Sequence, residues 1–144
     1  MLYKNIYLKE KFNEPTLQRP EGDRFIDAPL VDIDLQMLIK QLKHESAWRN
    51  SDRNAITVFK TNGLRIVLIA LHKCAEMAKH IAKGTISVQV LEGQLEFNTG
   101  LRSIELSKGQ MLALHERIPH SILAIRESVF LLTLTTSLQE EDIY

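Results

Sequence analysis

Apolar and polar residues alternate through much of the chain after residue 54, and this alternation predicts strands. Residues 85–91 show it most clearly, with one face made of Ile86, Val88 and Val90. Further strands are expected at 55–60, 64–72, around Leu95 and Phe97, and at 101–106, 111–115, 121–126 and 128–136. Turn signals such as Asn62-Gly63, which favours a tight hairpin, separate several of them. Short strands divided by such turns are typical of a sandwich or barrel.

The first fifty residues have a different pattern. Three of the four prolines fall within the first thirty residues, which predicts an irregular arm with one short strand near residues 6–8. A chain of 144 residues has the size of one domain. We therefore expect a single domain over 1–144, in which residues 1–50 form an arm with one helix and residues 52–137 form the β-structure.

One helix is expected near residues 34–46. Its apolar positions recur at the i, i+3, i+4, i+7 spacing of a single helix face, at Leu35, Leu38, Ile39 and Leu42. Asp32 or Asp34 can cap the start of the helix, because a carboxylate accepts a hydrogen bond from a free backbone N–H. Trp48 follows as a large apolar anchor.

Composition excludes several classes of function. Eighteen basic residues balance eighteen acidic ones, so the basic excess typical of nucleic-acid binders is absent. The longest apolar run, residues 66–71, is far shorter than the roughly 20 residues of a membrane helix. Residues 1–11 lack the apolar stretch of a signal peptide. The single cysteine, Cys74, fits a reducing compartment and is expected to be a small buried apolar residue. We expect a cytoplasmic protein that binds neither nucleic acid nor membrane.

Four short sequence features in the second half of the chain have a characteristic spacing. His80 precedes the turn sequence Val90-Leu91-Glu92-Gly93, and Gly109 precedes the pair Pro119-His120. This spacing resembles the two sequence motifs of the cupin family, over roughly residues 60–140. The resemblance implies an all-β fold with one helix near the N-terminus, arranged as a cupin-type jelly-roll β-barrel.

The resemblance also assigns the positions of a metal site. In the first motif, His80 takes the first histidine position, Ala82 the second, and Ile86 the glutamate position. In the second motif His120 matches, while His115 replaces a proline and Ala124 an asparagine. Two of the four ligands that the family offers are therefore apolar in this chain. The residues expected to line the cavity are His80, His120, His115, Ala82, Ile86 and Val88.

A metal ion here would have only two imidazole ligands from the motifs, those of His80 and His120. Catalytic metal sites normally hold about three protein ligands. His115 is the first candidate for an additional donor, and further candidates are Glu96, Gln94 and Gln110. Two alternatives stay open: a divalent metal (Zn, Fe, Mn or Ni) on the two histidines, or no cofactor, with both histidines hydrogen-bonded in the cavity.

Two functions follow from this resemblance. The first is a small-molecule-binding or sensing module, which could not itself bind DNA because no helix-turn-helix follows residue 136. The alternative is a metal-dependent enzyme of the isomerase or dioxygenase type that uses His80 and His120. A homodimer is also expected, because the run 66–71 is apolar on both faces. Either the N-terminal arm and helix or a second subunit must cover one of these faces.

Overall fold

Strands dominate the computed structural model, which describes residues 11–13 and 24–135. The strands are β1 (Lys11–Asn13), β2 (Arg24–Asp27), β3 (Arg53–Thr61), β4 (Leu64–Leu71), β5 (Glu76–His80), β6 (Ile86–Glu92), β7 (Gln94–Thr99), β8 (Ser103–Ser107), β9 (Met111–Leu114), β10 (His120–Ala124) and β11 (Ser128–Thr135). The helices are α2 (Leu35–His44) and α3 (Ser46–Asn50). The prediction of a mainly β chain is confirmed.

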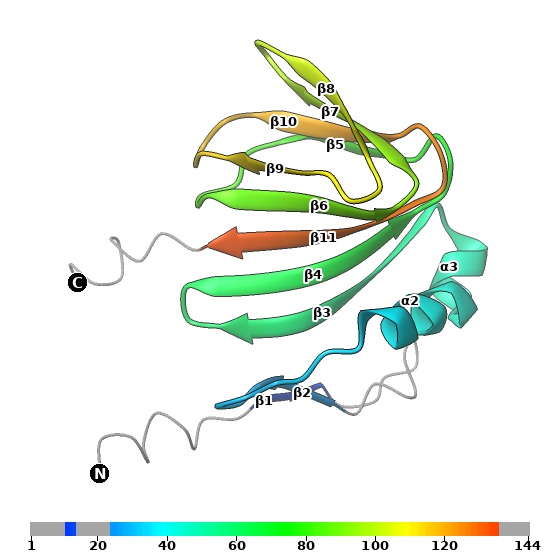
Figure 1. Cartoon of the computed structure of the whole chain (residues 1–144), viewed down its shortest axis with the longest axis vertical. Helices are drawn as coiled ribbons and strands as arrows, with labels where there is room; N and C mark the ends of the chain where they lie inside the picture. The colour runs from blue at the N-terminus through cyan, green and yellow to red at the C-terminus, as the bar shows by residue number, and fades with distance from the viewer. Residues whose placement is uncertain (1–10, 14–23, 136–144) are drawn as a thin grey trace, which may run out of the picture.

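Two antiparallel sheets face each other and enclose the main core (Figure 1). One sheet has the strand order β5-β10-β7-β8, and the other has the order β3-β4-β11-β6-β9. Strands β1 and β2 form a separate two-stranded ribbon. Consecutive strands often lie in different sheets, so connections such as 81–85 and 115–119 cross from one sheet to the other.

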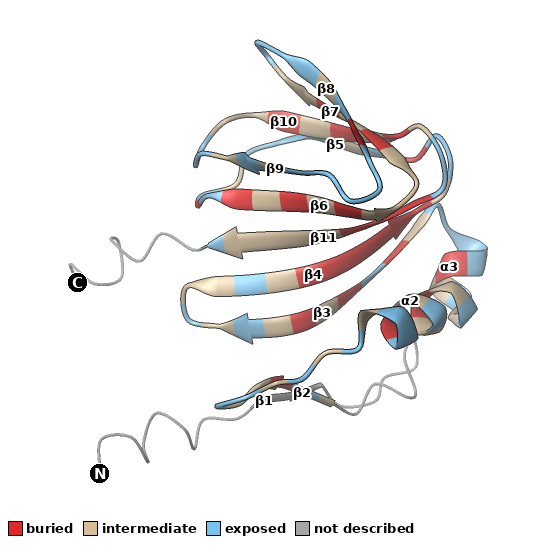
Figure 2. Cartoon of the chain, viewed as in Figure 1, coloured by how far each residue is buried: buried red, intermediate tan, exposed pale blue. Residues whose placement is uncertain are grey.

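The main core fills the space between the sheets, and Figure 2 shows its buried positions recurring along β6 and β10. Ile86, Val88 and Val90 are buried on β6, as their alternation predicted. The facing sheet contributes Leu95, Phe97 and Ile122. Burial of this apolar surface from both sheets is the main stabilising contribution to the fold.

A second core lies on the outer face of the five-stranded sheet. Leu68 and Ala70 of β4 point to this face, whereas Val67, Ile69 and Leu71 point to the main core. Helices α2 and α3 cover the outer face through the buried side chains of Leu38, Leu42 and Trp48. The run 66–71 is therefore apolar on both faces because both faces are buried within one chain. The apolar faces of residues 66–71 therefore no longer argue for a homodimer, which stays a prediction.

The helix expected near residues 34–46 is confirmed as α2, but the short second helix α3, which follows a break at Glu45, was not predicted. The backbone of Glu45 is extended, with φ −75° and ψ 150°. The side-chain amide of the buried Asn54 donates to the Leu42 carbonyl at 3.0 Å and to Glu45 Oε1 at 2.9 Å. These hydrogen bonds stabilise the break and let α3 turn Trp48 into the second core. The start of α2 agrees with the prediction, since Asp34 accepts from Met37 N at 3.1 Å.

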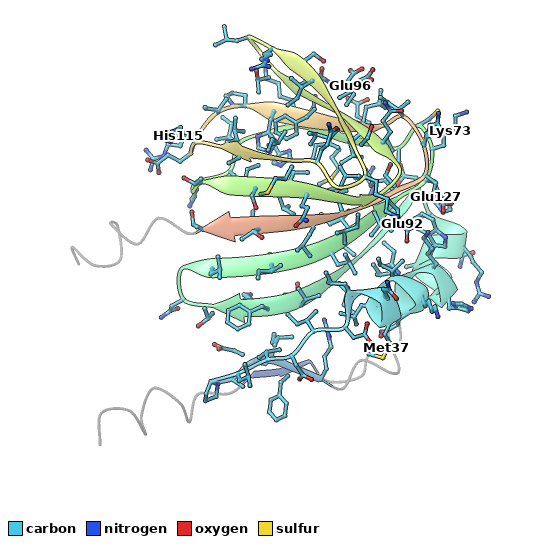
Figure 3. All side chains as sticks on the ribbon, in the orientation of Figure 1. Met37, Lys73, Glu92, Glu96, His115 and Glu127 are labelled. Carbon is cyan, nitrogen blue, oxygen red and sulfur yellow. The ribbon has the colours of Figure 1, made fainter. Side chains whose placement is uncertain are left out.

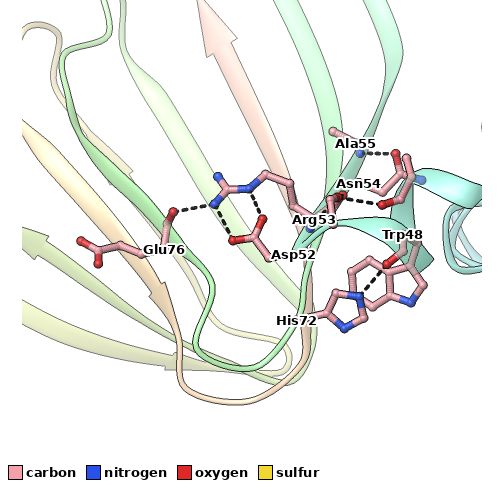
Figure 4. Close-up of polar contacts among 9 residues, drawn as sticks. Trp48, Asp52, Arg53, Asn54, Ala55, His72 and Glu76 are labelled. Atoms are coloured by element: carbon pink, nitrogen blue, oxygen red, sulfur yellow. Dashed lines mark hydrogen bonds and ion pairs between the residues drawn. The ribbon is translucent and has the colours of Figure 1, made fainter. Parts of the chain in front are cut away.

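Polar contacts fix the helices and the neighbouring turns against the sheet (Figure 4). Arg53 donates to both carboxylate oxygens of Asp52 and to the Glu76 carbonyl, which connects β3 to β5. Lys43 on α2 forms ion pairs with Glu92 at 2.9 Å and Glu127 at 3.2 Å. Burial lowers the pKa of Lys43, but the hydrogen bonds and charges of the two carboxylates outweigh it, so the pKa is raised.

Other expectations need correction. β5 was not predicted because its residues are mostly exposed and only Met77 contacts the core. β1 and β2 were not predicted either, and the strand expected near residues 6–8 lies outside the described residues. Cys74 is exposed rather than buried, because it lies in the turn between β4 and β5 with a positive φ of 72°. Within the described ranges, neither helix has the length and apolar character to cross a membrane.

Candidate functional site

Two histidines lie side by side where β5 ends and β10 begins. His80 and His120 are paired across these antiparallel strands, and their ring centroids are 4.2 Å apart with an interplanar angle of 61°. The pairing shifts register between His120 and Ile122, so the strands reach this contact through an irregularity. His120 also pairs with Thr99 at the end of β7. We call this end of the two sheets the imidazole end.

Main-chain carbonyl groups orient both rings. His80 Nδ1 lies 2.9 Å from the Ala78 carbonyl oxygen, and His120 Nδ1 lies 2.9 Å from the Ile118 carbonyl oxygen. A carbonyl oxygen only accepts, so each Nδ1 carries the hydrogen and donates it. In the neutral imidazole this leaves a lone pair on Nε2. Neither Nε2 has a hydrogen-bond partner within residues 24–135, so both remain available to a ligand.

The two histidines differ in their surroundings. His120 is only 3% exposed and stacks on Phe97, with the ring centroids 5.4 Å apart, whereas His80 is exposed. Burial lowers the pKa of His120, and the charge that His80 would carry lowers it further. The hydrogen bond to the Ile118 carbonyl acts in the opposite direction but is smaller than the effect of burial. His120 is therefore maintained as a neutral imidazole near neutral pH.

The other motif positions are apolar in the structure as in the sequence. Ile86 and Val88 are buried in the main core on β6, which belongs to the sheet opposite the histidine pair. Ala82 is half-buried and packs against the same core. None of the three supplies an oxygen or nitrogen side-chain atom to a ligand, so a polar ligand would meet only an apolar wall there.

His115 does not join the histidine pair. It is exposed in the connection from β9 to β10, and Figure 3 shows it at the end of the sheets away from Glu92 and Glu127. In the part of the chain that the structure describes, no group of three or more His, Cys, Asp or Glu side chains lies close enough to hold a metal ion. A catalytic first-row metal normally needs about three protein ligands. The donors present, two imidazoles, do not fit such a centre.

The other proposed donors are engaged elsewhere. Glu96 accepts from the Asn98 amide at 3.1 Å, and Gln94 donates to Glu105 at 3.0 Å. The Gln110 side chain accepts from Ser107 N at 2.8 Å, in the turn between β8 and β9. Each of these contacts stabilises local strand or turn geometry, so none of the three side chains supplements the histidines.

A small pocket of about 110 Å³ opens beside His120. Its polar wall includes Lys79, Asn98, Thr99 and Ser121, together with His120 itself, whereas His80 lies next to the pocket rather than in its wall. The motif positions in the sequence did not indicate these four polar residues. Their proximity follows from the register Thr99–His120 and Asn98–Ser121 between β7 and β10, and no local pattern in the sequence reveals that register.

Comparison with solved structures identifies the class of fold. The chain matches a conserved Streptococcus pyogenes protein of unknown function with a TM-score of 0.57, at 24% identity over 59% of this chain and 75% of that one. A cupin-2 domain protein from Shewanella frigidimarina matches with a TM-score of 0.59, at 16% identity over 72% and 93% of the two chains. An RmlC-like cupin with a double-stranded β-helix fold from Methanocaldococcus jannaschii gives 0.56, at 13% identity over 65% and 90%.

This chain therefore has the fold of cupin proteins. No family model and no curated protein matches its sequence. The matching structures are less than 25% identical to this chain, so they establish its fold only. Its chemistry depends on its own residues.

Proposed function

We propose that this protein is a small cupin-barrel module that binds or senses a small molecule at the His80–His120 pair. In this proposal the two sheets close as a jelly-roll β-barrel, and the ligand enters at the imidazole end. The observation that carries the proposal is the fixed orientation of both rings, each with Nδ1 bonded to a carbonyl oxygen and Nε2 left available. Two oriented acceptors in and beside a pocket form a recognition site for a ligand with hydrogen-bond donors.

The polar wall of the pocket supports a binding role. Thr99, Ser121 and Asn98 lie beside His120, and Lys79 contributes a cationic group. Ligand sites commonly place a few convergent polar groups against apolar surroundings. The main core supplies those surroundings here, since Phe97 stacks directly on His120.

A metal-dependent enzyme that uses His80 and His120 is the second candidate. One observation favours it: a bond from Nδ1–H to a carbonyl oxygen is also how proteins orient metal-binding histidines. The shortage of donors in the described residues opposes it. Metal analysis of protein purified without a histidine tag separates the two candidates. Stoichiometric zinc, iron, manganese or nickel that is lost in a His80→Ala, His120→Ala double variant would favour the enzyme, and sub-stoichiometric metal would remove it.

The binding proposal is tested by NMR on protein labelled with ¹⁵N in its histidine rings. The probes are four three-carbon compounds: glycerol, propionate, glycerate and 3-amino-1,2-propanediol. At least one should shift the Nε2 signals of His80 and His120. His44 is the internal control, because its Nδ1 also lies near a carbonyl oxygen, that of Lys40 at 2.7 Å, but on an exposed helix. If no probe shifts the paired histidines more than His44, the proposal is wrong.

We also propose that the protein forms a homodimer. Exposed apolar side chains support this, since Phe25, Leu30 and Met37 are 41%, 86% and 59% exposed around a surface pocket between β2 and α2. Sedimentation equilibrium at tens of micromolar tests it, and a monomer there would contradict it.

A further inference from the structure

We propose that Arg53 is a positioning residue for the His80–His120 pair, because it helps to hold β5 in the register that places His80 against His120. This inference rests on the proposed function, since that pair is the proposed site, and it adds a side chain that controls the geometry of the pair. It follows from the few contacts of β5, from the attachment of Arg53 to the opposite sheet and from the hydrogen bond between the two.

Strand β5 is weakly held by its own residues. It lies at the edge of the four-stranded sheet, and its partner strand within residues 24–135 is β10. Four of its five residues are exposed, and the fifth, Met77, packs against the main core. The register with β10 also shifts between His120 and Ile122. A strand without a buried face specifies its register weakly, and a slip by one residue would turn the His80 side chain to the other face of the sheet.

Arg53 supplies a contact to β5 from the opposite sheet. It is the first residue of β3, and Figure 4 shows its guanidinium group between Asp52 and Glu76. Arg53 Nη2 donates to the Glu76 carbonyl oxygen at 2.7 Å. Glu76 is the first residue of β5, and His80 is the last. Because each strand residue advances the chain by about 3.3 Å, the position of Glu76 determines how far along β10 the His80 ring lies.

Asp52 fixes the guanidinium group in the orientation that this contact needs. Arg53 Nε donates to one carboxylate oxygen at 2.8 Å, and Nη2 donates to the other at 3.1 Å. A two-point contact of this kind fixes the plane of the guanidinium group. The hydrogen bond from Arg53 lowers the pKa of Asp52 below its ordinary value of 3.8, so Asp52 is a carboxylate near neutral pH.

The main chain around Arg53 is anchored in the five-stranded sheet. Arg53 pairs with the fully buried Leu71 on β4. His72 N donates to the Asp52 carbonyl at 2.9 Å, and Ser51 Oγ donates to the Arg53 carbonyl at 2.7 Å. Arg53 therefore connects the exposed strand β5 to a well-packed part of the opposite sheet.

Main-chain hydrogen bonds also join the start of β5 to β10. Cys74 N donates to the Ala124 carbonyl at 2.8 Å, and Ala124 N donates to the Ala75 carbonyl at 2.9 Å. A change in the pairing of β5 with β10 would break these bonds and the contact with Arg53 together. Arg53 therefore raises the free-energy cost of such a change, and its loss should allow β5 to open or slip more often.

The test compares the full-length chain with its Arg53→Gln variant by NMR. We expect the amides of residues 76–80 to exchange with solvent deuterium about fivefold faster in the variant, because loss of the hydrogen bond to Glu76 favours opening of β5. The ring signals of His80 and His120 should show increased exchange broadening in relaxation-dispersion measurements, since both rings then sample a second arrangement. The amides of β4 should keep their wild-type exchange rates.

Three further variants sharpen the test. Arg53→Lys keeps the positive charge but lacks the planar fork, so it should recover less than about half of the lost protection. Asp52→Asn leaves the arginine in place but loosens its orientation, so exchange about twofold faster is expected, and this variant carries the test if Arg53→Gln does not fold. Arg65→Gln is the matched control, because Arg65 is an exposed arginine of β4 that donates to Thr57 Oγ1 at 3.2 Å within its own sheet.

Three results would overturn the proposal. The first is a folded Arg53→Gln or Asp52→Asn variant in which the signals of both rings are unchanged. The second is exchange that accelerates in β3 and β4 as much as in β5, which would make Arg53 a general structural residue. The third is an equal effect of Arg65→Gln on β5. Because no ligand is added, each of these results leaves the binding function standing, whereas failure of all four three-carbon probes would remove the binding function and leave the role of Arg53 intact.

Discussion

Trp48 and His72 stack face to face, with their ring centroids 3.5 Å apart and an interplanar angle of 16°. His72 Nε2 lies 2.8 Å from the Trp48 carbonyl oxygen, so the imidazole both stacks on the indole and donates to its backbone (Figure 4). Trp48 belongs to α3, and His72 directly follows β4. The pair therefore fixes the helical cover to the end of the five-stranded sheet.

Removing either partner should weaken the packing of the helices on the sheet and so lower the free energy of unfolding. Trp48→Ala deletes a buried indole and is expected to lower the free energy of unfolding by about 3–5 kcal/mol. His72→Ala removes one hydrogen bond and the stacking, and about 1–2 kcal/mol is expected. Urea unfolding followed by circular dichroism measures both. His44→Ala is the control at an exposed histidine of α2, and a loss as large as that of His72→Ala would contradict a specific role for the stacked pair.

Asp34 stabilises the start of α2 through its side chain. It accepts a hydrogen bond from Met37 N, whereas Asp32 makes no such bond to the described helix, although the sequence allowed either residue as the cap. Asp34→Ala should lower the free energy of unfolding by about 1 kcal/mol. Asp32→Ala, at an exposed carboxylate two residues away, should change it by less than about 0.5 kcal/mol. Equal losses in urea unfolding of the two variants would show that the cap is misassigned.

Strand positions were predictable where burial sets the sequence pattern. β6 alternates because one face meets the main core, and β4 is apolar throughout because cores lie on both of its faces. β5 gave no signal, since an exposed edge strand containing Glu76 and Lys79 needs no apolar pattern. The break between α2 and α3 could not be predicted from the local sequence either, because it depends on hydrogen bonds from Asn54, which lies on β3.

Only part of the candidate site was predictable from the sequence. The spacing of His80 and His120 within the motifs predicted that they would share a site, and the rings lie together. The polar wall of the pocket was not predictable, because Lys79, Asn98 and Thr99 come together only through the pairing of β5, β10 and β7. His115 was expected near the pair from its motif position alone. Its side chain instead lies exposed in the connection after β9, where no core contact holds it toward the histidines.

Cys74 should react freely in the folded protein. It is exposed, and its backbone N–H donates to the Ala124 carbonyl at 2.8 Å while φ is 72°. We expect an aromatic disulfide reagent to modify one thiol per chain under native conditions, since Cys74 is the single cysteine. Denatured protein provides the control and should give the same stoichiometry. A thiol that reacts only after unfolding would show that Cys74 is covered in solution.

Stability should fall in mild acid because of His120. Burial lowers its pKa in the folded protein below the ordinary value of 6.5, so the unfolded chain binds a proton at a higher pH than the folded chain does. The free energy of unfolding therefore rises with pH between the folded and unfolded pKa values, and the contribution of His120 is lost as pH falls through that window. Urea unfolding from pH 7.5 down to pH 5 measures this fall, and His120→Phe, which keeps a ring against Phe97, should reduce it. His44→Gln, at an exposed position, should leave the profile unchanged. A wild-type profile that His120→Phe does not alter would show that protonation of this ring is not linked to folding.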